Sequence, residues 1–346
     1  MLKTDQTLTL ETLLHHSSLA LGPGIDGALL AGVGPFTRAA EPPRSGTAFY
    51  CNDFALSNPT PWLIPSQVIR LEKPLPTDKR TLQVGPWTEP SAEAFAEVFR
   101  EVSQSIASGK IEKSVPACAA TAEILEGDPR ELLGACFDLP EPMMPYGMWD
   151  GDSGFVGASP ELLFRLDHGD LETMALAGTA RANEAEIFIF DDKEIREHEF
   201  VAQTLVSKLS DIGMVIRKNR EVMNLGSLIH FLSKIRVELY RNERIEDMIR
   251  RLHPTPALGP LPRTRETLAQ LHQWRARLDC PAQFGAPFGV LEDGIFTSLV
   301  AIRSVHWNKN ELTVPSGCGL IEASRLVNEW RELRLKRESV RQLFGI

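Results

Sequence analysis

The chain has 346 residues, of which 43% are hydrophobic and 24% charged, and its formal net charge at pH 7 is −9. This composition is typical of a soluble globular protein with one large domain or two modest ones. The negative charge and the lack of a basic run argue against nucleic acid and anionic membranes as partners, although a local pocket can still attract a small anion.

The cysteines and the N-terminal residues indicate a cytoplasmic protein. The five cysteines are Cys51, Cys118, Cys136, Cys280 and Cys318. Their wide spacing, without a C-x-x-C motif, argues against a disulfide framework or a zinc knuckle. The opening residues, MLKTDQTLTLET, lack the apolar core of a signal peptide, and no apolar run approaches the length of a membrane span.

The first quarter of the chain predicts short strands. Residues 27–36 and 46–56 are apolar and are separated by glycine and proline turns. The proline-rich stretch 59–90 predicts a boundary region or a set of edge strands and turns. We therefore divide the chain into a β-rich N-terminal part, residues 1–88, and a second region, residues 89–346.

The second region mixes helices and strands. Helices are predicted over 91–110, where Ser91 can cap the N-terminus, and over 192–209, 245–253, 264–278 and 324–343. Strands are predicted over 110–124, 153–167, 171–180, 226–239 and 311–324, with a hairpin over 284–307 that turns at Glu292-Asp293-Gly294. Because the pattern has no βαβ regularity, we expect an α+β fold with largely antiparallel sheets.

Two pairs of carboxylates stand out on the predicted helices. Glu194 and Glu197, in KEIREH, and Glu329 and Glu332, in EWRE, are each three residues apart, so each pair shares one helix face. Either pair could be a solvated face, and Glu332 could simply pair with Lys336. A di-iron site would need four helices and a histidine three residues after a glutamate. A third interpretation is a site for a hard cation such as Mg²⁺.

Other features are ambiguous when taken one at a time. The glycines of Ser316–Gly319 would let backbone N–H groups approach an anion, or they form a plain turn. The stretch 252–263 contains four prolines and forms either a pocket wall or a structural loop. His230 within a strand is usually a core residue, and Lys113 at a strand edge is usually exposed.

Taken together, a series of motifs from about residue 91 to the last residue resembles one family. They are, in order, SGKIEK, GASPELLF, ALAGTA, KEIREHEFV, LIHFLSKI, LHPTPALG, AIRS, GCGLIEAS and EWRELRLK. The chain is similar in these motifs to the chorismate-utilising enzymes, which include isochorismate, salicylate, anthranilate and aminodeoxychorismate synthases. The resemblance implies stacked antiparallel sheets flanked by helices. It is much weaker in the N-terminal part.

The resemblance also implies roles for individual residues. Glu197 and Glu332 match Mg²⁺ ligands, with Glu194 and Glu329 assisting partly through water, and the ion would hold the ring carboxylate of chorismate. The positions that match substrate-binding residues are Gly178, Thr179, His230, Ala257, Leu258, Arg303, Gly317, Gly319 and Lys336. Among these, Arg303, Lys336 and the N–H groups around the two late glycines would bind carboxylates. His230 would face the reacting ring.

The subgroup implied is that of the isochorismate synthases. Relatives that use water carry lysine where Lys113 stands, whereas ammonia-using relatives tend to carry glutamine. Aminodeoxychorismate synthases carry a lysine at the position of Ala177. The form HPTPAL, with Ala257 and Leu258, resembles siderophore-type isochorismate synthases. The expected reaction adds water at C2 of chorismate and expels the C4 hydroxyl, with Lys113 as a neutral, buried base and Glu161 as a protonated acid.

Some positions depart from the family pattern, and other activities remain open. Pro116 interrupts the strand, Cys118 replaces a common arginine, Cys318 replaces an alanine, and Pro260 replaces a glycine. The alternatives are a salicylate synthase, an anthranilate-type synthase with a separate glutaminase, and a weakly active chorismate-binding protein. The length leaves no room for a fused glutaminase, and we expect a monomer. The sequence leaves the pathway, menaquinone or siderophore, undecided.

Overall fold

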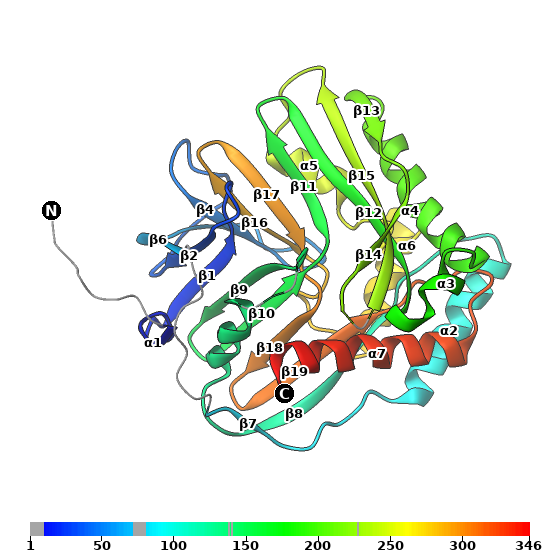
Figure 1. Ribbon diagram of the computed structural model, residues 1–346, viewed down its shortest axis with the longest axis horizontal. Coiled ribbons are helices and arrows are strands. Elements are labelled where there is room, and N and C mark those ends of the chain that lie inside the picture. Colours follow the sequence, from blue (N-terminus) through cyan, green and yellow to red (C-terminus); the bar gives the residue numbers. More distant parts are fainter. Residues whose placement is uncertain (1–9, 72–80, 138, 140, 227) are drawn as a thin grey trace, which may run out of the picture.

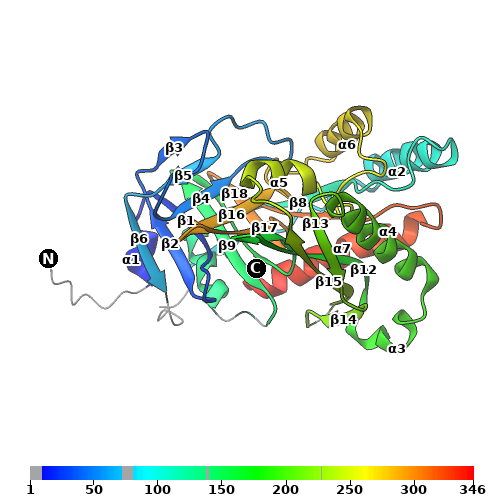
Figure 2. The same cartoon turned by 90° about the horizontal axis from the view of Figure 1, so that it is seen from above.

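The computed structural model describes residues 10–71, 81–137, 139, 141–226 and 228–346. In these residues two large β-sheets pack face to face, and helices lie on their outer faces (Figure 1, Figure 2). Neighbouring strands pair in antiparallel fashion in both sheets. The α+β architecture with stacked antiparallel sheets is thus confirmed.

The bounds of the strands follow the spatial order of each sheet. Within the described residues the first sheet has nine strands, in the order β6 (Gln67–Leu71), β2 (Leu29–Val33), β1 (Ser18–Pro23), β9 (Met144–Asp150), β10 (Ser153–Ser159), β18 (Ser304–Asn308), β19 (Glu311–Gly317), β8 (Ala117–Glu126) and β7 (Gln83–Val84). The second has ten on the same basis, namely β13 (Gly213–Arg217), β15 (Leu228–Leu239), β12 (Asp170–Arg181), β11 (Leu162–Asp167), β17 (Ile295–Val300), β16 (Pro287–Glu292), β4 (Ala48–Cys51), β5 (Trp62–Ile64) and β3 (Thr37–Ala39), with β14 (Glu221–Asn224) beside β15.

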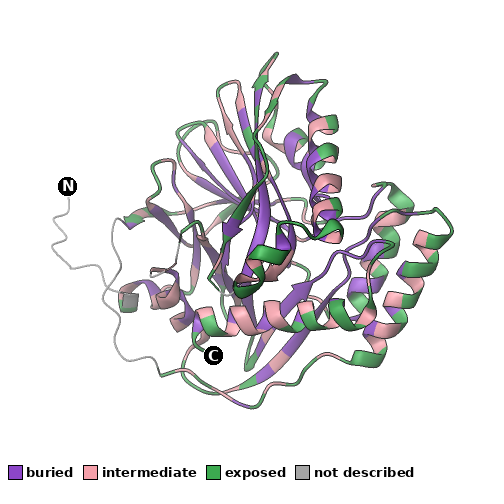
Figure 3. Cartoon of the chain, turned by 45° about the vertical axis from the view of Figure 1, so that its right-hand side comes forward, coloured by how far each residue is buried: buried purple, intermediate pink, exposed green. Residues whose placement is uncertain are grey.

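The helices come from several parts of the chain. They are α1 (Leu10–Leu14), α2 (Ala92–Ala107), α3 (Ala185–Phe188), α4 (Asp192–Leu209), α5 (Ile245–Leu252), α6 (Arg265–Arg277) and α7 (Leu326–Phe344), with short 3₁₀ segments at Pro129–Phe137 and Ala182–Glu184. Their outer faces are exposed while the central strands are buried (Figure 3). None of the described helices is long and apolar enough to cross a lipid bilayer.

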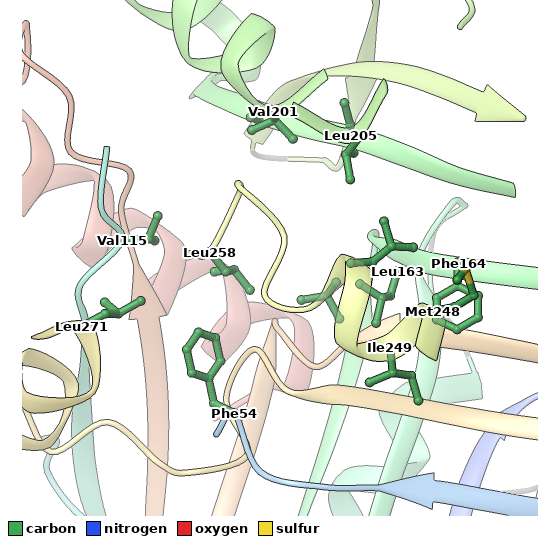
Figure 4. Close-up of a cluster of buried hydrophobic side chains, with 14 of the residues drawn as sticks. Phe54, Val115, Leu163, Phe164, Val201, Leu205, Met248, Ile249, Leu258 and Leu271 are labelled. Carbon is green, nitrogen blue, oxygen red and sulfur yellow. The ribbon is translucent and has the colours of Figure 1, made fainter. Parts of the chain in front are cut away.

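The core has three layers that fix the two sheets and the helices relative to one another. Leu30 and Phe155 of the first sheet meet Phe49 and Phe288 of the second between the sheets. Helices α4 and α5 bury their apolar faces on the second sheet, in a cluster that includes Leu205 (Figure 4). Helix α7 and the segment 129–137 pack on the first sheet. The carboxylate-bearing helices α4 and α7 are therefore held by different sheets.

The N-terminal strands belong to the same sheets as the later ones. β1 pairs with β9, and β4 pairs with β16, so strands from the first 88 residues join strands from beyond residue 140. Residues 72–80 of the proline-rich stretch and residues 1–9 lie outside the described residues. The boundary at residue 88 stays a prediction, but both sheets contain strands from either side of this residue.

Most of the predicted elements are confirmed. α4 has the predicted bounds, and α2 is capped by Ser91, whose Oγ accepts a hydrogen bond from Ala94 N–H at 3.1 Å. The hairpin of β16 and β17 turns after Glu292, as predicted. Beyond Leu252, the last residue of α5, the proline-rich stretch up to Arg263 contains no helix or regular strand.

Several boundaries were wrong. The stretch 153–167, predicted as a strand, forms two strands, β10 and β11, that belong to different sheets, and the predicted hairpin 284–307 ends at Val300, since β18 belongs to the first sheet.

The strand expected from residue 110 begins only at Ala117, because Pro116 lacks the N–H that a strand ladder needs. The strand expected to reach residue 324 ends at Gly317. The last helix begins at Leu326, and Ser324 instead accepts a hydrogen bond from Ile321 N–H at 3.1 Å.

Candidate active site

The two carboxylate pairs meet between α4 and α7. We call Glu194, Glu197, Glu329 and Glu332 the carboxylate quartet; the first three are at most 8% exposed. The Nζ atom of Lys193 lies 2.7 Å from Glu194 Oε1, 3.6 Å from Glu197 Oε2 and 3.5 Å from Glu329 Oε1. The local spacing left the two pairs as separate helix faces, and only the family resemblance implied that they meet; the fold brings one or more members of each pair to the same ammonium group.

The electrostatics of the quartet are uneven. Burial and then the neighbouring carboxylates raise the pKa of Glu194 to about 7 and that of Glu329 to about 8. Burial also acts to raise the pKa of Glu197, but the ammonium groups of Lys113 and Lys193 outweigh it and lower the pKa to about 2. The quartet therefore depends on nearby positive charge.

The quartet fits a hard cation in its chemistry. Its donors are carboxylate oxygens, the ligands that Mg²⁺ prefers. Glu329 Oε2 is buried and accepts no hydrogen bond, so one inward oxygen is unused. Within the described part of the chain, however, no three acidic, histidine or cysteine side chains already have the arrangement of metal ligands. Lys193 supplies the positive charge at the place where the oxygens converge.

Lys113 is not the exposed lysine that its position suggested. Its side chain is fully buried, and Nζ donates a hydrogen bond to Glu197 Oε1 at 3.0 Å. The burial expected of a base is thus present, but the expected apolar surroundings are not, because a carboxylate faces the ammonium group. The backbone of Lys113 is fixed by the 252–263 loop, since Leu261 N–H donates to Lys113 O at 2.9 Å.

Glu161 has the properties of a carboxylic acid that keeps a large protonated fraction near neutral pH. It follows β10, is 2% exposed, and accepts a hydrogen bond from Thr255 Oγ1 at 3.1 Å. Burial raises its pKa to about 7, although the Thr255 hydrogen bond and the charge of Lys113 act in the opposite direction. Thr255 was not singled out in the sequence.

One cavity connects Glu161 with most of the other predicted site residues. The predicted site residues on its wall are Glu161, Gly178, Thr179, Glu197, His230, Ala257, Leu258, Arg303, Gly317, Gly319 and Lys336. Lys113 lies behind the wall, against Glu197. The other quartet members, Glu194, Glu329 and Glu332, line a second, neighbouring cavity that also includes Thr179 and Lys193.

His230 fixes the most buried cation of the cavity. Its Nδ1 lies 2.8 Å from Gly178 O and its Nε2 lies 3.0 Å from Arg303 Nη2. Since arginine can only donate, Nε2 accepts and Nδ1 carries the proton. Burial lowers the pKa of His230 to about 3, so the ring is neutral. The histidine therefore orients Arg303 within the cavity, a role that its mid-strand position did not indicate.

Two cations make the cavity suitable for an anion. Arg303 is buried, and its backbone has a positive φ of 55°. Its guanidinium group forms no ion pair within the described residues. Lys336 Nζ lies 2.6 Å from Glu332 Oε1 and 2.9 Å from Gly317 O. Gly319 lies against the Glu197 and Lys113 side chains, because a Cβ atom there would collide with Glu197 Oε1 and crowd Lys113 Cε. Arg303 thus has unused donors that face the cavity.

Arg337 of α7 contacts Cys118 of β8, one of the positions that depart from the family pattern. The guanidinium group of Arg337 is 1% exposed and lies 3.4 Å from Cys118 Sγ and 2.9 Å from Ser316 Oγ. It also forms an ion pair with Glu89 at 2.9 Å. Arg337 therefore ties α7, and with it half of the quartet, to β8 and β19.

Comparison with known proteins identifies the family. The sequence model described as "Chorismate binding enzyme" matches residues 65–345, most of the chain. The chain belongs to this family. The resemblance noted in the sequence motifs is therefore confirmed.

Several curated proteins are similar over part of the chain. Isochorismate synthase MenF from Haemophilus influenzae is 28% identical over 204 residues, 56% of this chain and 46% of the relative. The salicylate biosynthesis isochorismate synthase of Pseudomonas aeruginosa is 31% identical over 204 residues, 56% and 42% of the two chains. Anthranilate synthase component 1 of Acinetobacter calcoaceticus is 27% identical over 269 residues, 72% and 53%. The matches thus span about half the length of these relatives.

Solved structures share the fold along nearly the whole chain. The menaquinone-specific isochorismate synthase MenF from Escherichia coli superposes with a TM-score of 0.83 at 20% identity, covering 98% of this chain and 92% of that one. Anthranilate synthase component I from Streptococcus pneumoniae gives a TM-score of 0.66 at 15% identity, covering 98% and 95%. At these identities the likeness concerns the fold.

Proposed function

We propose that the protein is a Mg²⁺-dependent isochorismate synthase, which converts chorismate to isochorismate. The observation that carries this proposal is the cavity lined both by Arg303, a buried cation without an ion pair among the described residues, and by Glu161, a carboxyl group whose pKa burial raises to about 7. Lys113 lies close enough for its charge to act on Glu161. An anionic substrate, a proton donor and a proton acceptor therefore meet in one place.

The reaction can be assigned to residues of the chain. Arg303 and Lys336 would bind the substrate carboxylates. Glu161 would protonate the departing C4 hydroxyl. Lys113 would first lose one ammonium proton to bulk solvent, and the neutral amine would then take a proton from the water that attacks C2. Mg²⁺ would be held by Glu197 and Glu332, with Glu194 and Glu329 assisting, and would neutralise and position the ring carboxylate.

The main test is incubation of the purified protein with chorismate and Mg²⁺, with and without ammonium, followed by chromatography of the products. Isochorismate in both samples supports the proposal. Anthranilate formed only with ammonium would establish the anthranilate-type alternative. Salicylate with pyruvate would establish a salicylate synthase, and no turnover would leave a chorismate-binding protein. Three points stay predictions. They are the pathway that the isochorismate would supply, menaquinone or siderophore, the monomeric state, and the cytoplasmic location.

Product choice should depend on Leu258. Its side chain lies on the cavity wall and packs in the same cluster as Phe54 and Val115 (Figure 4). A bulky group there can keep the side chain of the bound product from folding over the ring, the geometry needed to lose pyruvate. We expect Leu258→Ala to keep isochorismate formation and to release some pyruvate, measured with coupled lactate dehydrogenase. The gain should be modest, since one side chain discriminates by about 1–3 kcal/mol.

A matched control separates this effect from general loosening of the core. Leu271 is fully buried in the same cluster but does not line the cavity, so Leu271→Ala should lower stability without releasing pyruvate. If neither variant releases pyruvate, Leu258 serves only in packing.

The pH dependence should report Glu161. Because its protonated form is the acid, kcat/KM should fall as the pH rises through about 7. The Thr255 hydrogen bond lowers the pKa of Glu161, so Thr255→Val should raise that pKa and move the falling limb to higher pH. Thr173→Val is the control, since Thr173 is equally buried but donates to Leu163 O. A limb that stays in place in Thr255→Val would contradict the assignment of the acid.

A further inference from the structure

Lys193 occupies the centre of the carboxylate quartet. Its Nζ atom lies within 3.6 Å of an oxygen of Glu194, Glu197 and Glu329, and the side chain is 21% exposed. Lys113 and Lys336 each contact one quartet member, Glu197 and Glu332 respectively. Among these lysines, therefore, Lys193 alone bridges helices α4 and α7 through the carboxylates.

The quartet needs such a charge when no metal is bound. Three of its members are nearly buried, and like charges at this depth repel strongly unless a cation compensates them. At the same time one buried oxygen, Glu329 Oε2, accepts no hydrogen bond. One ammonium group has three donors and cannot satisfy every oxygen that faces it, so the arrangement still offers ligand atoms to a cation of higher charge.

We propose that Lys193 is a resident counter-ion of the quartet, and that a divalent cation binds by displacing its ammonium group. This inference rests on the metal site of the proposed function and adds a competitor to it. The contacts that Lys193 Nζ makes at 2.7 and 3.5 Å use Glu194 Oε1 and Glu329 Oε1, so a metal ion that binds these two oxygens must replace the ammonium group. The neighbouring cavity lined by Lys193 and Asp191 gives the displaced side chain room and a carboxylate nearby.

Metal binding in the absence of chorismate tests the competition directly. Calorimetric titration with Mg²⁺ should show tighter binding to Lys193→Met than to wild type, by roughly 5–150-fold, the usual range for coupled binding events. Lys193→Arg keeps the charge and should stay near wild type. Lys234→Met removes the same charge from an exposed position on β15 and should leave the affinity unchanged.

Thermal unfolding without metal gives a second measurement. Lys193→Met leaves buried carboxylates uncompensated, so its Tm should fall by roughly 5 °C, while Mg²⁺ should raise the Tm of this variant more than that of wild type. Equal Mg²⁺ affinity and equal metal-free Tm in Lys193→Met and wild type would overturn the inference. Because neither measurement uses chorismate, this failure is distinct from failure of the proposed reaction, which appears as absence of isochorismate from a protein that binds Mg²⁺.

Discussion

Lys113→Gln is expected to lower kcat for isochorismate formation by roughly 10²–10⁴-fold, the usual loss when a general base is removed. Glutamine cannot take a proton from water. It can still donate a hydrogen bond to Glu197, the partner of the Lys113 ammonium group at 3.0 Å, so the protein should remain folded. Chromatography of chorismate reaction mixtures gives the rate, and thermal unfolding checks the fold.

An exposed lysine nearby provides the control. Lys110 lies three residues earlier on the surface, and Lys110→Gln should leave kcat unchanged. Near-normal turnover by Lys113→Gln would remove Lys113 from the mechanism. Ammonium should not divert wild-type product to an amino compound if water is the nucleophile.

Glu161→Gln should cause a loss of similar size, roughly 10²–10⁴-fold in kcat. Glutamine has the shape of the protonated carboxyl group and carries no charge, so chorismate binding should change little while the departing hydroxyl loses its proton donor. The residual activity should also lack the fall near pH 7 that is expected of wild type if Glu161 is the acid. Steady-state rates and calorimetric chorismate affinity separate the two effects.

The matched control is Glu172→Gln, because Glu172 is exposed on β12. This change should alter neither kcat nor the pH profile. A Glu161→Gln enzyme with normal kcat would show that another group protonates the leaving hydroxyl.

Elements with strong periodicity could be predicted from the sequence. α4 and α2 carry both an apolar stripe and a capping residue, and their bounds agree with prediction within a few residues. β1, β9 and β13 were not predicted as strands, although β1 and β9 lie next to each other inside the first sheet. Their sequences, SLALGP and MPYGMWD, contain glycine and proline, which weaken the local strand signal.

In the candidate site, too, features set by local sequence could be predicted, whereas features set by contacts between distant segments could not. The i, i+3 spacing placed the two carboxylates of each pair on one face, and the family resemblance predicted that the pairs meet. The positions of Lys193 and Thr255 depend on contacts between distant segments, and no local pattern distinguishes Thr255 from a loop threonine. One signal was available for Lys193, because it stands four residues before Glu197, the spacing of a helical ion pair.

The ion pair between Lys113 and Glu197 joins residues that are 84 positions apart in the sequence. Antiparallel pairing such as that of β1 with β9 adds further contacts of long range. Chains dominated by such contacts fold slowly, because the entropy of closing long loops is lost before the contacts compensate for it. Helix α4 can form early on its own periodicity, but the site that it shares with α7 can form only when both sheets have assembled. Catalytic competence should therefore be among the last properties to be recovered during refolding.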